Sequence, residues 1–320
     1  MAHRGDRGGR CRCGCGRGVR WRLAVTETRS YYGRPVIKEP VWQPEIPWYF
    51  FTGGLAGASG VLSLVARLRG NEPLARRSLY IGAAADVVSP ALLISDLGRP
   101  ERFLNMFRVF KVTSPMSVGS WILGVSSGAS VSAALLEATG RLKPVKYLAE
   151  LVSALSGGPL SVYTATLVSD TAVPVWHEAR HELPFVFGSS ALASAGAAAC
   201  TLVAPKDAGP ARRLAIGGVV AEGIFTQVME RRLGMLADPY REDEAGKYSK
   251  LAKTCAAGGA ALLVLRGKRS RLAAVAGGTL LLAGEAALRW SVFKAGFQSA
   301  RDPKYTVIPQ RERAPTQNGA

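Results

Sequence analysis

Three carboxylic acids lie inside long apolar stretches of this 320-residue chain, where a charge is costly to hold. Asp86 falls in GAAADVVSP, Glu222 in VVAEGIF and Glu285 in LAGEAALRW. A carboxyl group in such surroundings can receive or release a proton, so Asp86 and Glu222 are candidates for proton transfer. Arg289 follows Glu285 by one helical turn, and we expect these two residues to form a structural pair.

A loop rich in charged and aromatic residues separates two apolar stretches, and it reads SDLGRPERFLNMFRVFKVTSPMSVGSW over residues 95–121. Pro100 suits the first turn of a helix. Phe103, Phe107 and Phe110 recur at helical spacing, so we expect a short helix in the membrane interface. Its basic residues are candidates for contact with a partner protein or a head group, and they are Arg99, Arg102, Arg108 and Lys111. An interfacial cap without a partner is the alternative.

Histidine and cysteine offer little for a metal or a haem. Three cysteines in RCRCGCGRG have no fourth ligand nearby. His3 lies in the same basic tail, and His177 and His181 lie beyond the end of an apolar stretch. Two axial histidine ligands inside a bundle are therefore lacking, and we predict no haem, no metal site and no iron–sulfur cluster in this chain.

The elements that must position these residues are long apolar helices. A bilayer core needs about 20 apolar residues per helix. We predict an all-α integral membrane protein with eight transmembrane helices, over residues 48–66, 79–94, 117–136, 147–168, 184–204, 214–229, 251–265 and 272–292. The fourth contains SGGP at 156–159, and Pro159 predicts a kink there.

The net charge of +18 would suggest a nucleic-acid partner for a soluble protein. Here the basic residues gather at the ends of apolar stretches, which is typical of membrane topology, so we expect a lipid bilayer and no nucleic acid. Fourteen Lys and Arg residues lie in four short connections, at 67–77, 141–146, 206–213 and 266–271. The positive-inside rule therefore places these connections in the cytoplasm and both termini outside the cytoplasmic (inner) membrane.

Five segments resemble a known family. They are YYGRPVIKEPVW, IPWYFFTGGLAG, the 95–121 loop, DTAVPVWHEARHELPFVF and SARDP. Together they are similar to the polysulfide reductase NrfD/PsrC family, above all to actinobacterial-type members found with formate dehydrogenases. The resemblance covers residues 30–310 and leaves the first 28 residues outside.

The resemblance implies a membrane anchor that passes electrons between a docked iron–sulfur, ferredoxin-like subunit and the quinone pool, with a molybdopterin catalytic subunit beyond it. The exchangeable cofactor would be menaquinone or ubiquinone, and the chain would have no turnover alone. A quinone site needs an apolar slot with a few polar groups. The resemblance suggests Tyr163 as a quinone contact, and Tyr49 and Thr52 on the first helix are further candidates. Ordinary packing or an aromatic belt is the alternative for the tyrosines.

These expectations divide the chain into five parts. Residues 1–28 form a disordered basic tail, 29–47 an N-terminal docking segment, 48–170 a quinone-binding four-helix bundle, 171–295 a second four-helix bundle, and 296–320 a C-terminal tail. The docking segment, the 95–121 loop and the C-terminal tail share one face. A secondary transporter and a purely structural anchor are the rival functions, and a transporter would show discontinuous helices in matching places.

Overall fold

A computed structural model describes residues 36–313 of the chain, which form helices and connecting loops without a β-strand in that range. Eight helices of 20 or more residues are α1 (Glu45–Leu68), α2 (Glu72–Asp96), α3 (Pro115–Thr139), α4 (Lys143–Ser169), α6 (Leu183–Leu202), α7 (Gly209–Leu233), α8 (Asp243–Leu265) and α9 (Arg271–Arg301). Short helices lie between or after them, and these are η1 (Pro100–Phe107), α5 (Pro174–Glu178), η2 (Ala179–His181), η3 (Gly234–Tyr240) and α10 (Lys304–Arg313). The predicted tail 1–28, with its cysteines and His3, lies outside the described residues.

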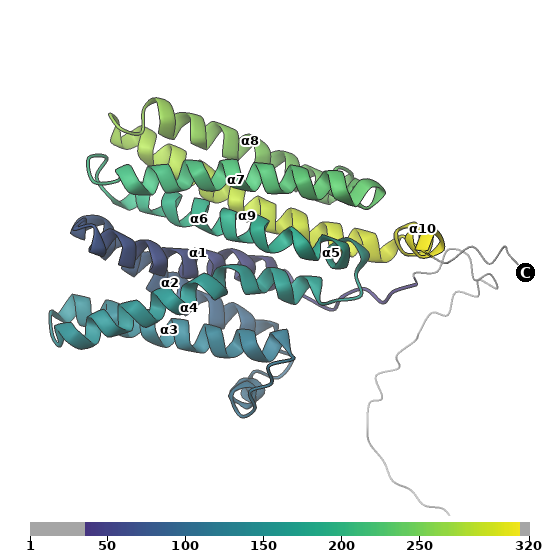
Figure 1. The fold of residues 1–320 in the computed structure, drawn as a ribbon, viewed down its shortest axis with the longest axis horizontal. Helices are drawn as coiled ribbons and strands as arrows, with labels where there is room; N and C mark the ends of the chain where they lie inside the picture. The colour runs from purple at the N-terminus through teal and green to yellow at the C-terminus, as the bar shows by residue number, and fades with distance from the viewer. Residues whose placement is uncertain (1–35, 314–320) are drawn as a thin grey trace, which may run out of the picture. The chain divides into compact units, whose positions relative to one another are not determined.

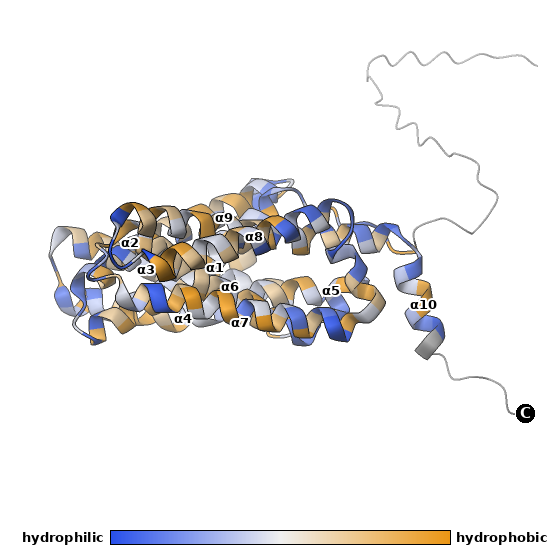
Figure 2. Cartoon of the chain, turned by 90° about the horizontal axis from the view of Figure 1, so that it is seen from above, coloured by the Kyte–Doolittle hydropathy of each residue, from blue (hydrophilic) through white to orange (hydrophobic). Residues whose placement is uncertain are grey.

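Six of the long helices are long and apolar enough to cross a membrane. They are α1, α2, α3, α4, α6 and α9, and together with the family described below they make the chain a multi-pass membrane protein. The other two long helices, α7 and α8, are more polar because basic and acidic residues extend into both of them. Figure 2 shows apolar residues along the helices and hydrophilic residues mainly at their ends.

The helices pack in two sets that meet along α1 (Figure 1). In the first set α1 packs on α2 and α4, and α3 packs on α2 and α4. In the second set α6 packs on α7 and α9, and α8 packs on α9. Glycines allow the closest approach: a Cβ on Gly57 of α1 would lie 2.2 Å from the carbonyl oxygen of Gly157 on α4. Gly57 therefore packs helices together, as small residues do in membranes.

Several helix boundaries differ from the sequence prediction. α2 begins at Glu72 rather than at residue 79, because the Asn71 side chain accepts the Leu74 N–H at 3.2 Å and caps the helix. α9 continues to Arg301, so residues 296–301, which we assigned to a tail, are helical. α4 is one continuous helix through Pro159. It lacks the discontinuity that the transporter hypothesis predicts.

The 95–121 loop contains a short helix, as predicted, but it is a 3₁₀ helix. It spans Pro100–Phe107, with Pro100 at its start. The Arg102 N–H bonds the Arg99 carbonyl and the Arg108 N–H bonds the Asn105 carbonyl, both at i to i+3 spacing. A 3₁₀ helix rises more per residue than an α-helix, which suits a short segment fixed at both ends.

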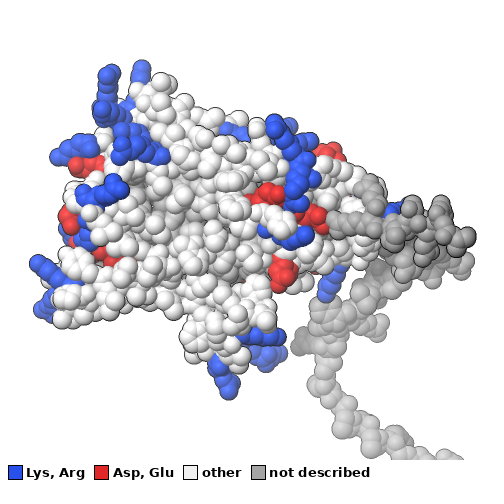
Figure 3. Space-filling view, viewed as in Figure 1, with Lys and Arg blue, Asp and Glu red and all other residues white. Residues whose placement is uncertain are grey.

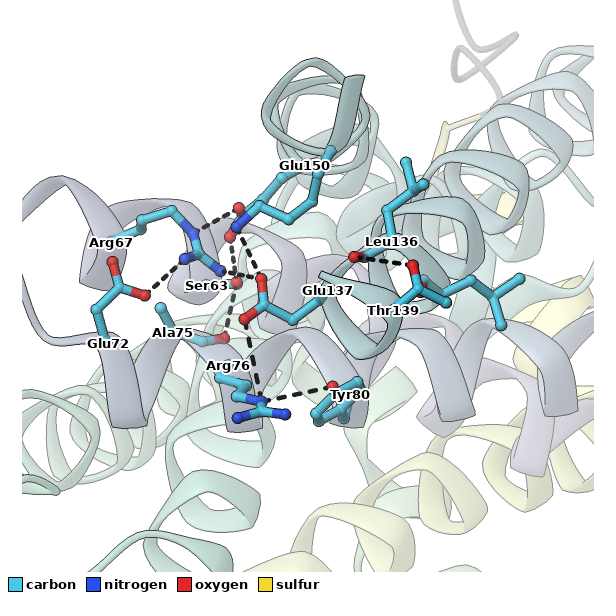
Figure 4. A network of polar contacts seen from close by, with 12 residues as sticks. Ser63, Arg67, Glu72, Ala75, Arg76, Tyr80, Leu136, Glu137, Thr139 and Glu150 are labelled. Atoms are coloured by element: carbon cyan, nitrogen blue, oxygen red, sulfur yellow. Dashed lines mark hydrogen bonds and ion pairs between the residues drawn. The ribbon is translucent and has the colours of Figure 1, made fainter. Parts of the chain in front are cut away.

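Charged side chains gather at the two ends of the helices, with an almost uncharged band between them on the face drawn in Figure 3. One end holds the short α1–α2, α3–α4, α6–α7 and α8–α9 connections. There Arg67 donates to Glu150 at 2.6 Å and to Glu72 at 2.6 Å, and Glu150 also accepts from Ser63 at 2.6 Å (Figure 4). Glu150 is 1% exposed, so this network ties α1, α2 and α4 together inside the protein.

The motif-rich segments lie at the opposite end. The Gln43 N–H donates to Asp96 at 3.2 Å, and Arg301 pairs with Glu39 at 2.9 Å. Trp42 stacks on Trp176 of α5, with ring centroids 5.4 Å apart. The described part of the docking segment therefore contacts the end of α2, α5 and the end of α9.

Candidate functional site

Two of the predicted quinone-contact residues meet in the first helix set. Tyr49 lies in the first turns of α1 and is fully buried, and Tyr163 lies near the C-terminal end of α4. Their phenol oxygens are in direct hydrogen-bonding contact, although 114 residues separate them in the chain. Two phenols that share one hydrogen bond leave a second donor available to another group.

Gly119 of α3 sets the position of the Tyr163 ring. A Cβ at this glycine would lie 2.0 Å from Cε2 of Tyr163 and 2.7 Å from both Cδ2 and Cζ. Real side-chain contacts are far longer, so only glycine leaves room for the ring here. Sequence reasoning missed Gly119, because a glycine in an apolar helix has no signature that points to a distant partner.

Hydroxyl groups join α1 to α2 beside this tyrosine pair. Ser89 Oγ lies 2.8 Å from Thr52 Oγ1 and 2.8 Å from its own helix carbonyl at Ala85. Thr52 Oγ1 is 3.5 Å from the Tyr49 carbonyl oxygen. Thr52 is therefore one turn from Tyr49, which contacts Tyr163, and it is bonded to α2 through Ser89.

Asp86 lies one turn before Ser89 on α2 and is fully buried. Its carboxylate accepts hydrogen bonds from Ser130 at 2.6 Å, Ser126 at 3.3 Å and Ser127 at 3.4 Å, all on α3. The sequence selected Asp86 but not these serines. Their spacing in SSGAS, which puts them on neighbouring positions of one helix, was the signal available.

The four basic candidates of the loop, Arg99, Arg102, Arg108 and Lys111, are all exposed. The aromatic side of the loop packs inward on α3. Phe107 lies 5.6 Å from Trp121 and 5.5 Å from Phe103, between ring centroids, and Phe110 lies 6.1 Å from Trp121. The aromatic residues therefore hold the loop on the helices and leave the basic residues free to meet another molecule.

Several buried polar atoms on α1–α4 have no hydrogen-bond partner in the described part of the protein, and two of them are on α3 and α4. These two are Nε1 of Trp121 on α3 and Oγ1 of Thr164 on α4, next to Tyr163. Buried donors without partners are rare, and these two can donate to a water or to another bound molecule. A cavity of about 490 Å³ also lies one turn beyond Tyr163, lined in part by Thr166, Asp170 and the two exposed histidines, His177 and His181.

Glu222 is not part of this region. It lies on α7 in the second helix set, close to Glu285 and Arg289 of α9. The expected Glu285–Arg289 pair is also different in detail. Arg289 Nη2 donates to the Phe187 carbonyl at 2.9 Å, and Glu285 accepts from Ser190 at 2.6 Å.

Metal-ligating side chains do not cluster in the part of the chain that the structure describes: no group of three His, Cys, Asp or Glu residues there could hold a metal ion. His177 of α5 and His181 of η2 are both exposed. The described residues thus supply hydroxyls, phenols and carboxyls for hydrogen bonding and proton transfer.

Comparison with known families gives one match. A family model described as "Polysulphide reductase, NrfD" matches residues 37–209, which is just over half of the chain. The match spans α1 to α6 and includes Tyr49, Asp86, the 95–121 loop and Tyr163, but it ends before Glu222. No curated protein matches the chain.

Proposed function

The chain belongs to the polysulphide reductase NrfD family, and from this premise we propose that it is the quinone-reactive membrane subunit of a molybdopterin iron–sulfur oxidoreductase. In this role it exchanges electrons between a docked ferredoxin-like iron–sulfur subunit and menaquinone or ubiquinone. A molybdopterin subunit, for which formate is our preferred substrate, carries out the substrate reaction. The chain itself has no turnover without these partners.

The contact between Tyr49 and Tyr163 is the observation that carries this proposal. A quinone is recognised through its two carbonyl oxygens, which accept hydrogen bonds from donors in an apolar slot. The two phenols come from helices far apart in the sequence and meet among buried apolar residues. Ordinary packing would not require two hydroxyls to face each other inside a membrane protein.

Two further donors on α3 and α4 are also consistent with a quinone. Trp121 and Thr164 each hold a buried polar atom that lacks a partner within the protein, and a carbonyl oxygen would accept from either donor. A bound quinone accepts two electrons and two protons on full reduction. Tyr163 and Tyr49 would orient the head group, and Thr52 would hold α1 against α2 through Ser89.

Asp86 would supply or take up protons at this site. Its carboxylate lies one turn from Ser89 and is surrounded by three serine hydroxyls, which can pass a proton along hydrogen bonds. The basic loop residues Arg102 and Arg108 and the segment around Glu39 would form the docking face for the iron–sulfur subunit. Their exposure at one end of the helices supports this assignment.

Removing single phenol oxygens tests the proposal. In the complex purified with its partner subunits, Tyr163→Phe and Tyr49→Phe should each lower quinone-dependent electron transfer about tenfold, the effect of roughly one lost hydrogen bond. Tyr147→Phe is the matched control, because Tyr147 lies on the same helix, is 48% exposed and is at the opposite end. Equal rates in all three variants would defeat the assignment of the site.

The orientation is part of the proposal. Eight spans, arranged as two four-helix bundles, with the basic connections in the cytoplasm, would place both termini outside the inner membrane. A reporter fused after residue 320 should then behave as external and one inserted in the connection at 67–77 as cytoplasmic. The reverse pattern would move the docking face to the cytoplasmic side.

A further inference from the structure

A second group of buried acids lies in the helix set that the proposed quinone site does not use. Glu285 and Arg289 of α9 are each 1% exposed and Glu222 of α7 is 9% exposed. The two carboxyl groups lie within hydrogen-bonding reach of each other, and both are close to the Arg289 guanidinium. Ser190 of α6 donates to one oxygen of Glu285 at 2.6 Å.

The hydrogen bonds of this group are incomplete. Glu222 Oε2, Glu285 Oε1 and the Nε and Nη1 atoms of Arg289 are all buried without a partner. Two carboxylates cannot bond each other, since neither has a proton to donate. One proton held between the two carboxyl groups would let them bond each other, as in other pairs of close carboxyl groups.

Charge balance requires the same proton. Two carboxylates and one guanidinium would leave a net charge of −1 in surroundings where an uncompensated charge is costly. One shared proton makes the group of Glu222, Glu285 and Arg289 neutral. No other charged side chain is named among the groups that act on these two carboxyls in the described residues.

A cavity connects this group to the end of the helices. It has a volume of about 240 Å³ and lies between α6, α7, α8, α9 and η3, and Glu222, Thr226 and Tyr240 are among its lining residues. Each of these three side chains has a buried oxygen without a partner in the protein. A cavity of this size has room for several waters, which can bond the polar groups in its otherwise largely apolar lining.

The far wall of the cavity reaches the charged end of the protein. Glu230 lines it and pairs with Lys253 at 3.0 Å and with Arg241 at 3.2 Å, and both of these basic side chains are more than half exposed. Burial raises the pKa of the Tyr240 phenol, and the nearby Glu230 adds to this effect, so Tyr240 stays protonated and can donate to water. The cavity thus runs from the buried acid pair to a water-facing ion pair.

We propose that Glu222 and Glu285 share one proton and exchange it with bulk water through this cavity. The site is a proton store within α6–α9, separate from the Tyr49–Tyr163 region. The Arg289 side chain extends the site to the boundary of the two helix sets. A Cβ on Gly54 of α1 would lie 3.4 Å from Arg289 Nη2. The proposal does not depend on quinone chemistry, since its test observes the carboxyl groups directly.

Infrared spectroscopy of the purified, full-length protein in detergent tests the sharing. At neutral pH the spectrum should contain the C=O band of one protonated carboxylic acid that is lost in Glu222→Gln and also in Glu285→Gln. In either variant the remaining carboxylate alone neutralises Arg289, and the new amide donates in place of the shared proton. Asp86→Asn should keep this band. A band that persists in either glutamine variant overturns the proposal.

Deuterium exchange tests the water path. Transfer into D₂O should shift the band in the wild-type protein, and Thr226→Leu, which fills the cavity, should slow this shift at least tenfold. Tyr240→Phe, which removes one donor, should slow it less. Thr254→Leu is the matched control, because Thr254 lies exposed on α8 and bonds only its own helix. Equal exchange rates in Thr226→Leu and Thr254→Leu would show that no water path runs through the cavity.

Discussion

Replacing Gly119 by alanine tests whether the position of Tyr163 matters, without removing any hydroxyl. The new Cβ would lie 2.0 Å from Cε2 of Tyr163. Because carbon atoms rest about 3.5–4.0 Å apart, the ring must retreat by roughly 1.5 Å. Its phenol oxygen would then be displaced relative to Tyr49 and to any head group that bonds the pair. A misplacement of about 1 Å in a reacting site can cost roughly a hundredfold in rate, so we expect a loss of that order.

The matched control is Gly128→Ala on the same helix. A Cβ at Gly128 meets no atom within 4 Å, and alanine is favoured over glycine in a helix by roughly 0.5–1 kcal/mol. This variant should keep wild-type activity and equal or higher thermal stability. Both variants would be assayed in the complex with its partners, as quinone-dependent electron transfer in lipid vesicles, with thermal unfolding followed in parallel. Overpacking at Gly119 should cost about 1–3 kcal/mol of stability. The variant should therefore still fold, so that its electron-transfer rate can be measured.

The rate comparison decides the matter. If Gly119→Ala transfers electrons to quinone as fast as Gly128→Ala, displacing the Tyr163 ring does not change the electron-transfer rate. The tyrosine pair is then not the quinone site. If its unfolding temperature falls but its rate does not, Gly119 serves packing alone.

Three further substitutions address the other candidate residues. Asp86→Asn keeps the serine hydrogen bonds nearly intact and should leave assembly unchanged while slowing quinone reduction about a hundredfold; full activity would place the proton route elsewhere. Replacing both Arg102 and Arg108 by Glu reverses two exposed charges and should cost several kcal/mol of docking energy, so the iron–sulfur subunit should be lost in mild detergent; an intact complex would reduce the loop to a cap. Glu150→Gln removes a buried carboxylate that bonds a guanidinium at 2.6 Å and should lower the free energy of unfolding by about 2 kcal/mol without changing the quinone rate; an unchanged unfolding temperature would show that the remaining acids of that network suffice.

The helices were largely predictable because apolar stretches bounded by charged residues are strong signals in a membrane protein. Their ends were not, since caps and polar contacts extend helices beyond the apolar core. Asn71 moves the start of α2, and the pairing of Arg301 with Glu39 accompanies the extension of α9. The buried pairing of Arg67 with Glu150 was also hidden, because in the sequence Arg67 is one of several basic residues beside a loop.

The individual candidate residues could be selected from the sequence, but their grouping in space could not. For Tyr49 and Tyr163 the sequence also allowed ordinary packing or an aromatic belt. Only the close helix packing at Gly119 and Gly57 brings their hydroxyls together. Nothing in a single sequence reports a contact across 114 residues. Conversely, Asp86 and Glu222 were both candidates for proton transfer, whereas the structure places them in different helix sets.

The two kinds of buried acid differ in how their charge is compensated, and this difference is why we propose different tasks for them. Asp86 faces three serine hydroxyls on α3, and no salt bridge involves it among the described residues. Its protonation changes the net charge of its surroundings. This suits a group that takes up a proton when a neighbouring electron acceptor is reduced. Glu222 and Glu285 face Arg289, so one bound proton leaves their group neutral and losing it creates a charge. Such a pair should hold its proton until another takes its place, which makes it a store rather than a donor. Asp86→Asn should therefore alter the quinone rate and keep the shared-proton band, while Glu222→Gln should remove the band even in protein without quinone.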